Sequence, residues 1–187
     1  MRVEETNRIE IERRMEGMGD FMKMDYLNSC LKQSLDFDTR KFVLVKLAGI
    51  YEENRMFIEA GKLFRNAADI NATVGGRLTD FIKSCELFIK GGKFEEADVS
   101  FSRALSCVSG FEVNRIKEIV KEFYKTQAKL YLANDKRRHA METYEKLIMG
   151  FNLDMEERKF VKGQLLDLYK RLGKNKDYET LAGREDF

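Results

Sequence analysis

The sequence predicts an all-α protein made of antiparallel helical hairpins, with about nine or ten helices in one domain. The chain has no proline, and charged residues make up 35% of its 187 residues. Lys, Glu, Leu, Arg and Ala dominate the composition, which favours helix over strand. A hydrophobic fraction of 43% is too high for a disordered chain and sufficient for a buried core. One spacing of apolar and small residues also recurs along the chain.

The clearest copy of this spacing lies between Phe81 and Ala104, where two apolar helices flank a Gly-Gly break. Its residues follow one another at steps of 3, 6, 3, 4 and 3, and they are Cys85, Phe88, Phe94, Ala97, Phe101 and Ala104. The same steps join two further sets, Ala48, Tyr51, Phe57, Ala60, Phe64 and Ala67, and then Ala128, Tyr131, Arg137, Ala140, Tyr144 and Leu147. Steps of three and four place residues on one helix face, and the step of six crosses the turn.

Residues 1–37 are expected to form an N-terminal hairpin or an end cap. Val3–Met15 has the pattern of a weak amphipathic helix, and two glycines follow it as breakers. Phe21–Leu35 places apolar residues three and four apart, which predicts a second helix with Asp20 as its cap.

Residues 38–153 are expected to hold three recognisable hairpins. The first ends in a loop at residues 72–77, which contain a Gly-Gly pair. The second starts at Thr79 or Asp80. The third begins with a long helix over residues 112–133, which no breaker interrupts.

Residues 154–187 are expected to close the array with capping helices. Met155–Leu172 has a helical apolar face, and Gly173 and Asn175 break it before a short last turn at Asp177–Ala182. A truncated, polar end piece suits a stacked array, because no neighbour covers the outer face of the terminal repeat.

The repeated positions resemble the tetratricopeptide repeat (TPR) family, whose pattern sets small residues and aromatics at these steps on either side of a turn. Small residues let two helix backbones approach closely, and the aromatics fill the gaps beside them. The resemblance covers residues 39–150 and implies a right-handed superhelix of hairpins, an α-α solenoid. The repeats are 37 residues apart from Ala60 to Ala97 and 43 apart from Ala97 to Ala140. Such irregular spacing is similar to that of the soluble attachment proteins of membrane fusion.

The composition excludes several other classes of protein. A net charge of +2 is too small to indicate nucleic-acid binding. Cys30, Cys85 and Cys107 lack CxxC spacing, so we expect buried free thiols in a reducing compartment. The charged amino-terminal stretch has no apolar signal core, and no apolar run approaches the roughly 20 residues needed to cross a bilayer. These features together predict a cytoplasmic protein.

No pattern in the sequence indicates catalysis, a metal or a cofactor. His139 is the single histidine and stands in a basic turn, where an exposed structural role is expected. The two Gly-Gly pairs lack the strand and helix context of a phosphate-binding loop. We therefore expect a protein that is not an enzyme and carries no cofactor.

The candidate binding residues follow from the TPR resemblance, because in that family the first helix of each hairpin lines a concave face that holds a peptide. The polar residues on those helices include Lys46, Lys83, Glu86, Lys90, Lys125 and Lys129, which we take as the candidate site. Spacings of three and four put Lys83, Glu86 and Lys90 on one face and Lys125 and Lys129 on another. A lysine-lined groove favours an acidic peptide, whereas a simply solvated helix face is the alternative interpretation.

The sequence therefore predicts a non-enzymatic scaffold or adaptor that binds a peptide or protein partner through its helical-repeat surface. A membrane-fusion attachment factor is the first alternative, and a lengthwise basic stripe would favour it. An RNA-binding repeat protein is a weaker alternative, which would need a continuous basic face with exposed stacking aromatics. A small enzyme would need a deep pocket with clustered titratable groups.

Overall fold

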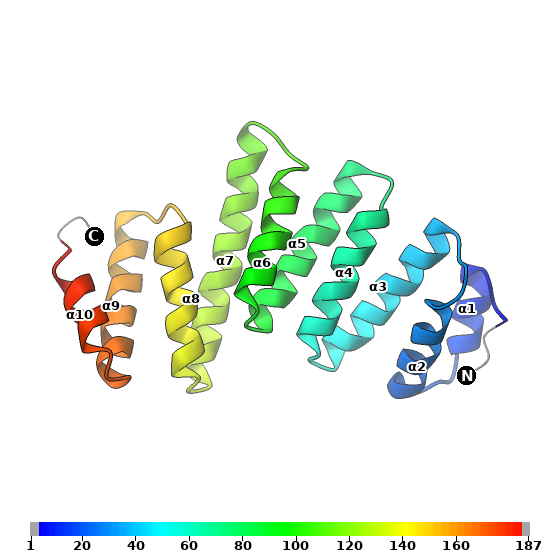
Figure 1. Cartoon of the computed structure of the whole chain (residues 1–187), viewed down its shortest axis with the longest axis horizontal. Coiled ribbons are helices and arrows are strands. Elements are labelled where there is room, and N and C mark those ends of the chain that lie inside the picture. Colours follow the sequence, from blue (N-terminus) through cyan, green and yellow to red (C-terminus); the bar gives the residue numbers. More distant parts are fainter. Residues whose placement is uncertain (1–3, 185–187) are drawn as a thin grey trace. The chain divides into compact units, whose positions relative to one another are not determined.

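The computed structural model describes residues 4–184, and this part of the chain is helical with no strand (Figure 1). Its helices are α1 (Arg8–Met15), α2 (Asp20–Cys30), α3 (Phe37–Glu53), α4 (Phe57–Ile70), α5 (Val74–Lys90), α6 (Phe94–Leu105), α7 (Phe111–Ala133), α8 (Arg137–Gly150), α9 (Met155–Arg171) and α10 (Asn175–Ala182). The prediction of an all-α fold is confirmed. None of the helices in this part is both long enough and apolar enough to cross a bilayer.

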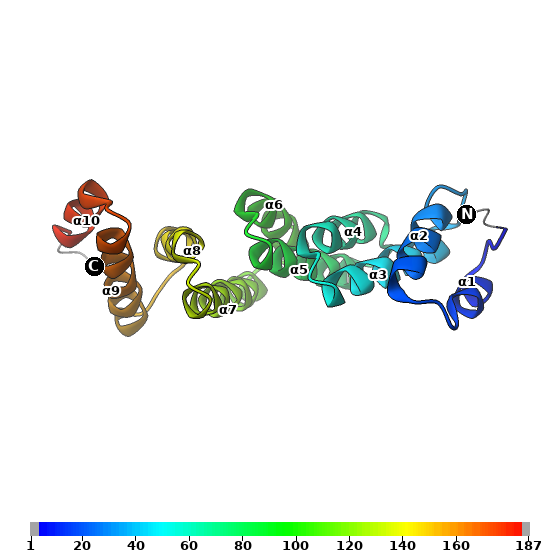
Figure 2. The same cartoon turned by 90° about the horizontal axis from the view of Figure 1, so that it is seen from below.

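The helices belong to two compact units, Met1–Val113 and Asn114–Phe187. In the first unit α2 packs against α3, α3 against α4, α4 against α5 and α5 against α6, and α1 packs against α3. Figure 2 shows α1 and α2 at the amino-terminal end of this unit, beyond α3. Ile11, Tyr26, Leu27, Val43 and Leu47 form one buried cluster there. Both α1 and α2 therefore contribute side chains to the core of the first unit.

Small residues of the repeated spacing lie at the helix contacts of the first unit. Six of these residues are fully buried, namely Ala48, Ala60, Ala67, Cys85, Ala97 and Ala104. Gly61 extends this set, because a Cβ atom there would lie 3.2 Å from the ring of Phe88. The Ser84 hydroxyl donates to the Gly61 carbonyl oxygen at 2.8 Å and lies 3.0 Å from the Ser100 hydroxyl. These contacts bring α4, α5 and α6 close together.

The second unit has its own core. α8 packs against α9, and α9 packs against α10. Ala128, Ala140 and Leu147, from the third copy of the spacing, are fully buried, and Tyr131 and Tyr144 are nearly so. Buried side chains of α9, such as Leu165 and Leu168, complete this core.

Four hairpin turns share one backbone geometry. In each, an amide donates at 2.8 Å to the carbonyl oxygen of an aromatic residue five positions earlier, in the pairs Met56–Tyr51, Lys93–Phe88, Lys136–Tyr131 and Lys174–Tyr169. The residue before each donor has a positive φ, and these residues are Arg55, Gly92, Asp135 and Gly173. This combination is the Schellman stop of a helix. The chain thus makes the same turn after α3, α5, α7 and α9.

The start of α5 differs from the sequence prediction. Residues 72–77 were expected to form a loop because of their Gly-Gly pair, but α5 begins at Val74. The Thr73 hydroxyl accepts a hydrogen bond from the Gly76 amide at 3.1 Å, which caps the helix. Gly76 also leaves room for the Asn71 side chain, which a Cβ atom would overlap. The glycines therefore form the first turn of a helix.

Smaller differences occur at the helix ends and at two side chains. α1 begins at Arg8, where Asn7 caps it, and Val3 of the predicted helix lies outside the described residues. Cys30 and Cys85 are buried as predicted, but Cys107 is partly exposed because it follows the end of α6. Phe101, expected in the core, is also only partly buried.

Candidate partner-binding site

The structure places the six predicted binding residues in three separate surroundings. Lys83, Glu86 and Lys90 lie together on α5 and meet Glu52 of α3. The Lys83 ammonium lies 2.8 Å from the Glu52 carboxylate and 3.1 Å from the Glu86 carboxylate. Lys90 pairs with the same two carboxylates at 3.4 Å and 2.5 Å. Two ammonium groups thus face two carboxylates, and the cluster has no net charge.

The hydrogen bonds of this cluster outweigh the cost of its burial. Burial alone would raise the pKa of the Glu86 carboxyl, but the hydrogen bonds from Lys90 and Lys83 hold that pKa below its ordinary value. For Lys83, burial would lower the pKa of the ammonium, and the bonds to Glu52 and Glu86 raise it instead. These charges are satisfied within the chain and form a link between α3 and α5.

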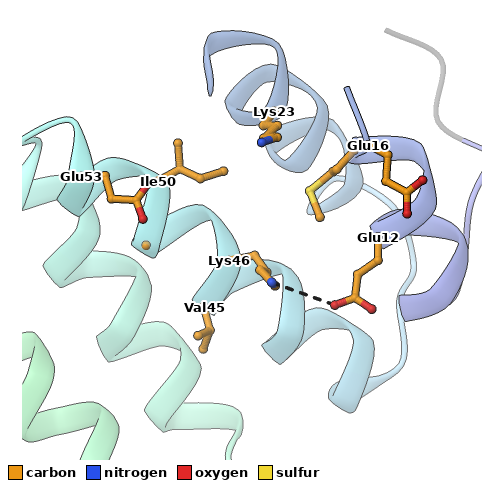
Figure 3. Close-up of a pocket in the computed structure, with 9 residues that line it drawn as sticks. Glu12, Glu16, Lys23, Val45, Lys46, Ile50 and Glu53 are labelled. Carbon is orange, nitrogen blue, oxygen red and sulfur yellow. Dashed lines mark ion pairs between the residues drawn. The ribbon is translucent and has the colours of Figure 1, made fainter. Parts of the chain in front are cut away.

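Lys46 lies in a second place, an open cleft of about 580 Å³ between α1, α2 and α3, here called the N-terminal cleft (Figure 3). Its ammonium lies 4.0 Å from the carboxylate of Glu12 on α1. Figure 3 also shows Glu16, Glu53 and Lys23 around the cleft. Three carboxylates and two ammonium groups line it together, so its charge does not favour an acidic ligand.

Lys125 and Lys129 lie together in the second unit. Both line a cleft of about 300 Å³ formed by α7, α8, the loop after α8, and α9, here called the C-terminal cleft. Its apolar walls come from Leu153, Phe160 and Val161, and Phe160 is 49% exposed. Lys125 is paired, because its ammonium lies 2.6 Å from Glu122 and 2.8 Å from Glu157. Lys129 makes no ion pair with any residue between 4 and 184.

Tyr144 supplies a second unused polar group to the wall of the C-terminal cleft. Its side chain is 1% exposed, and its ring lies edge-on to Phe160 with 6.4 Å between ring centroids. The buried hydroxyl finds no hydrogen-bond partner in the described part of the chain. Burial raises the pKa of this phenol, so the hydroxyl stays protonated and can donate. A buried donor without an acceptor is costly.

Glu157 holds the rim of the C-terminal cleft in place. Its carboxylate receives hydrogen bonds from Lys121 at 3.2 Å and Lys125 at 2.8 Å, which join α9 to α7. It also completes a capping box with Asp154 at the start of α9. The pKa of the Glu157 carboxyl is lowered to about 2 from its ordinary value of 4.5. The bond from Lys125 is the main cause, burial opposes it, and the bonds from the Asp154 amide and Lys121 add to it.

Replacing Glu157 by Gln is expected to destabilise the second unit by about 1–2 kcal/mol at neutral pH, because the lowered pKa measures stabilisation of the charged form. A carboxyl with a lowered folded-state pKa stabilises fully above pH 4.5, and this stabilisation is lost as the pH falls toward 2. Urea denaturation of both proteins between pH 7 and pH 2 measures the difference. Glu156→Gln, one residue away and exposed, is the matched control and should change little. A difference between Glu157→Gln and the parent that stays constant over this range would contradict the assignment.

Comparisons with known proteins identify no family. No protein-family profile matches the chain, and no curated protein matches it either. One matching solved structure is the "Crystal structure of BtubC (BKLC) from P. vanneervenii". The alignment covers 90% of this chain and 72% of that chain, with 19% sequence identity and a TM-score of 0.38. A score this low does not establish a shared fold.

The sequence prediction named the lysines but missed the carboxylates that form ion pairs with them and so decide which lysine can bind a ligand. Glu12, Glu52 and Glu157 were not among the predicted site residues, although each pairs with one or more predicted lysines. Only Glu157 left a local signal, because Asp154 and Glu157 have the spacing of a capping box. Nothing in the sequence predicted that the Tyr144 hydroxyl would lack a partner among the described residues. The repeat pattern predicts only that an aromatic ring lies at this position.

Proposed function

We propose that this chain is a non-enzymatic scaffold of TPR-like helical repeats, which binds a peptide or protein partner in the C-terminal cleft. The repeat arrangement is supported by the four equivalent helix stops after α3, α5, α7 and α9. It is supported further by the burial of the small residues of all three copies of the spacing. Repeats of this kind stack into a superhelix whose inner face is open to a ligand.

The observation that carries the binding proposal is the composition of the C-terminal cleft. The Lys129 ammonium, which has no ion pair among residues 4–184, and the half-exposed ring of Phe160 line one apolar recess, with the buried ring of Tyr144 behind it. Apolar walls with a few convergent polar groups are typical of a binding site. Lys125, Lys129, Glu156 and Glu157 together leave the cleft without net charge, so its apolar walls select the ligand first. The ligand that suits them has a large apolar side chain, and a carboxylate next to that side chain would meet Lys129.

The cluster at Lys83, Glu86 and Lys90 has a different role in this proposal. Its ammonium groups already have carboxylate partners, so an incoming acidic group would have to displace Glu52 or Glu86. Within the six candidate residues, Lys129 is therefore the one that we assign to the carboxylate of a partner.

Lys129→Glu is expected to reduce the recovery of the partner about tenfold, because a carboxylate of the ligand would then meet a like charge. Quantitative pull-down from native lysate measures this, with circular dichroism to confirm that the helix content is unchanged. Lys159→Glu is the matched control, since this exposed residue lies on α9 but does not line the cleft. Phe160→Ala should lower the recovery as well, because it removes one apolar wall.

The sign of the ligand's charge can be tested on the same cleft. Glu156 is the exposed carboxylate on its rim, and Glu156→Gln should leave or raise the recovery of an acidic partner. Recovery that fell with Glu156→Gln and survived Lys129→Glu would show a basic partner and refute the proposal. A partner that was lost equally with Lys159→Glu would place binding elsewhere on the second unit.

A further inference from the structure

We propose that the first unit has an oxyanion site of its own, which takes a phosphate group in a cleft between α4, α5 and α6. This arginine cleft has a volume of about 300 Å³ and is lined by Asp69, Arg77, Phe81, Arg103, Ser106 and Cys107, together with Val74. It shares no lining residue with the N-terminal or C-terminal cleft. The inference is therefore independent of the proposed partner site.

Arg103 is fixed in the arginine cleft by two contacts. Its guanidinium forms a two-point ion pair with the Asp69 carboxylate, in which Nη1 lies 3.3 Å from one oxygen. The same guanidinium lies over the ring of Phe81, 4.6 Å from the ring centroid. Ring and carboxylate together hold the group in one orientation, which reduces the entropy lost when a ligand binds.

Arg77 differs from Arg103 because the guanidinium of Arg77 has no carboxylate partner among the described residues. It makes no ion pair with any residue of the described part of the chain, and its Nε–H is buried without a hydrogen-bond acceptor. A buried donor on a charged group is costly when it stays unpaired. Arg77 as a whole is partly exposed, so the structure leaves in the cleft a guanidinium that no carboxylate of the described residues neutralises.

The charge of the arginine cleft favours an anion. Arg77 and Arg103 supply two positive charges, and Asp69 supplies one negative charge, which is already engaged by Arg103. The sum is one positive charge. The amino end of α5 and the carboxyl ends of α4 and α6 all border the cleft, so the helix dipoles add no net positive potential and the side chains alone supply it. Guanidinium groups suit phosphate because their planar N–H pairs match two oxygens at once.

The volume of the cleft sets the size of the ligand. A space of about 300 Å³ holds a phosphate together with a small group attached to it, such as a phosphorylated side chain. Free inorganic phosphate and a phosphoserine peptide present the same oxyanion, so the test includes both. The two probes differ only in the attached group that Val74 and Phe81 would contact.

Titration with inorganic phosphate and with the peptide Gly-phosphoserine-Gly, at constant ionic strength, tests the site by the shift in melting temperature. The parent should give a saturable rise that chloride does not reproduce. Arg77→Gln should weaken the response about tenfold or more, because it removes a charge-assisted hydrogen bond. Lys62→Gln, an exposed residue of α4 outside the cleft, removes the same charge and should change nothing. Asp69→Asn should strengthen binding, because it frees Arg103.

Cys107 gives a second readout that does not depend on stability. It is the partly exposed thiol of the chain and lines the arginine cleft, whereas Cys30 and Cys85 are fully buried. Alkylation by the neutral reagent iodoacetamide should therefore report on Cys107, and bound phosphate should slow it in the parent. The same phosphate should give no protection in Arg77→Gln.

Two results would overturn the proposal. One is a parent protein with no saturable response to either probe and no protection of Cys107. The other is Arg77→Gln that responds as the parent does. Tighter binding of the phosphoserine peptide than of inorganic phosphate would identify a phosphorylated protein segment as the ligand, and the reverse order would identify the free anion; both outcomes support the site.

Discussion

Phe88→Ala is expected to lower the free energy of unfolding by about 3–5 kcal/mol, the usual cost of removing a large ring from a packed core. The ring of Phe88 is fully buried, and it fills the space that Gly61 leaves on α4. The guanidinium of Arg65, also on α4, lies over the ring 5.2 Å from its centroid. These neighbours belong to a helix that the close approach at Gly61 holds in place, so they cannot collapse into the cavity.

Urea denaturation followed by circular dichroism measures this loss, and amide hydrogen exchange in α4 and α5 shows that it belongs to the first unit. Phe101→Ala is the matched control, because it is the same substitution at a repeat position that is only partly buried. The control should cost about 1–2 kcal/mol, in proportion to the smaller area removed from contact. If the two variants lost the same free energy of unfolding, the full burial of Phe88 would not be the cause of its large effect.

The positions of the core were predictable from the sequence because they depend on residue size and spacing alone. Ala60, Ala97 and Ala140 recur at one place in the repeat, and each is fully buried. A small residue at a helix crossing leaves room for the neighbouring backbone, and the sequence displays that property directly. Phe101 shows the limit of the pattern, since its step is the same as that of Tyr144 but its burial is not.

The turns were predictable in position but not in their common geometry. Gly92 and Gly173 indicate a positive φ by their residue type, and Asp135 does so more weakly because aspartate is enriched there among the other residues. Arg55 adopts a positive φ without such a signal. The carbonyl oxygens of Tyr51 and Tyr131 receive the same hydrogen bond as that of Phe88. The pairing of α3 and α4 therefore imposes a positive φ on Arg55, which does not favour it.

The candidate site was harder to predict because ion pairs join residues that are far apart in the sequence. Lys83 meets Glu52 across 31 positions, and Lys125 meets Glu157 across 32. Spacing on one helix shows which lysines share a face, but the carboxylates come from other helices. Lys129 and Arg77 stand out only after the ion pairs around them, such as Lys125–Glu157 and Arg103–Asp69, have been identified.

Ala97→Leu is expected to lower the free energy of unfolding by about 3 kcal/mol, near the upper end of the usual cost of overpacking. Ala97 is fully buried on α6, which packs against α5. The Ser84–Ser100 hydrogen bond at 3.0 Å fixes the distance between these two helices. Leucine adds three carbon atoms at this contact, so either the helices separate and strain that bond, or the new side chain takes an unfavourable rotamer.

The melting temperature of Ala97→Leu, compared with that of Ser102→Leu, measures the effect. Ser102 is exposed on the same helix, so Ser102→Leu introduces the same side chain without overpacking and should melt at the parent temperature or slightly above. A fall for Ala97→Leu alone would show that the small residue is required by the approach of α5 and α6. An Ala97→Leu protein as stable as the parent would mean that the shared register of the repeats, from which the scaffold proposal starts, is wrong.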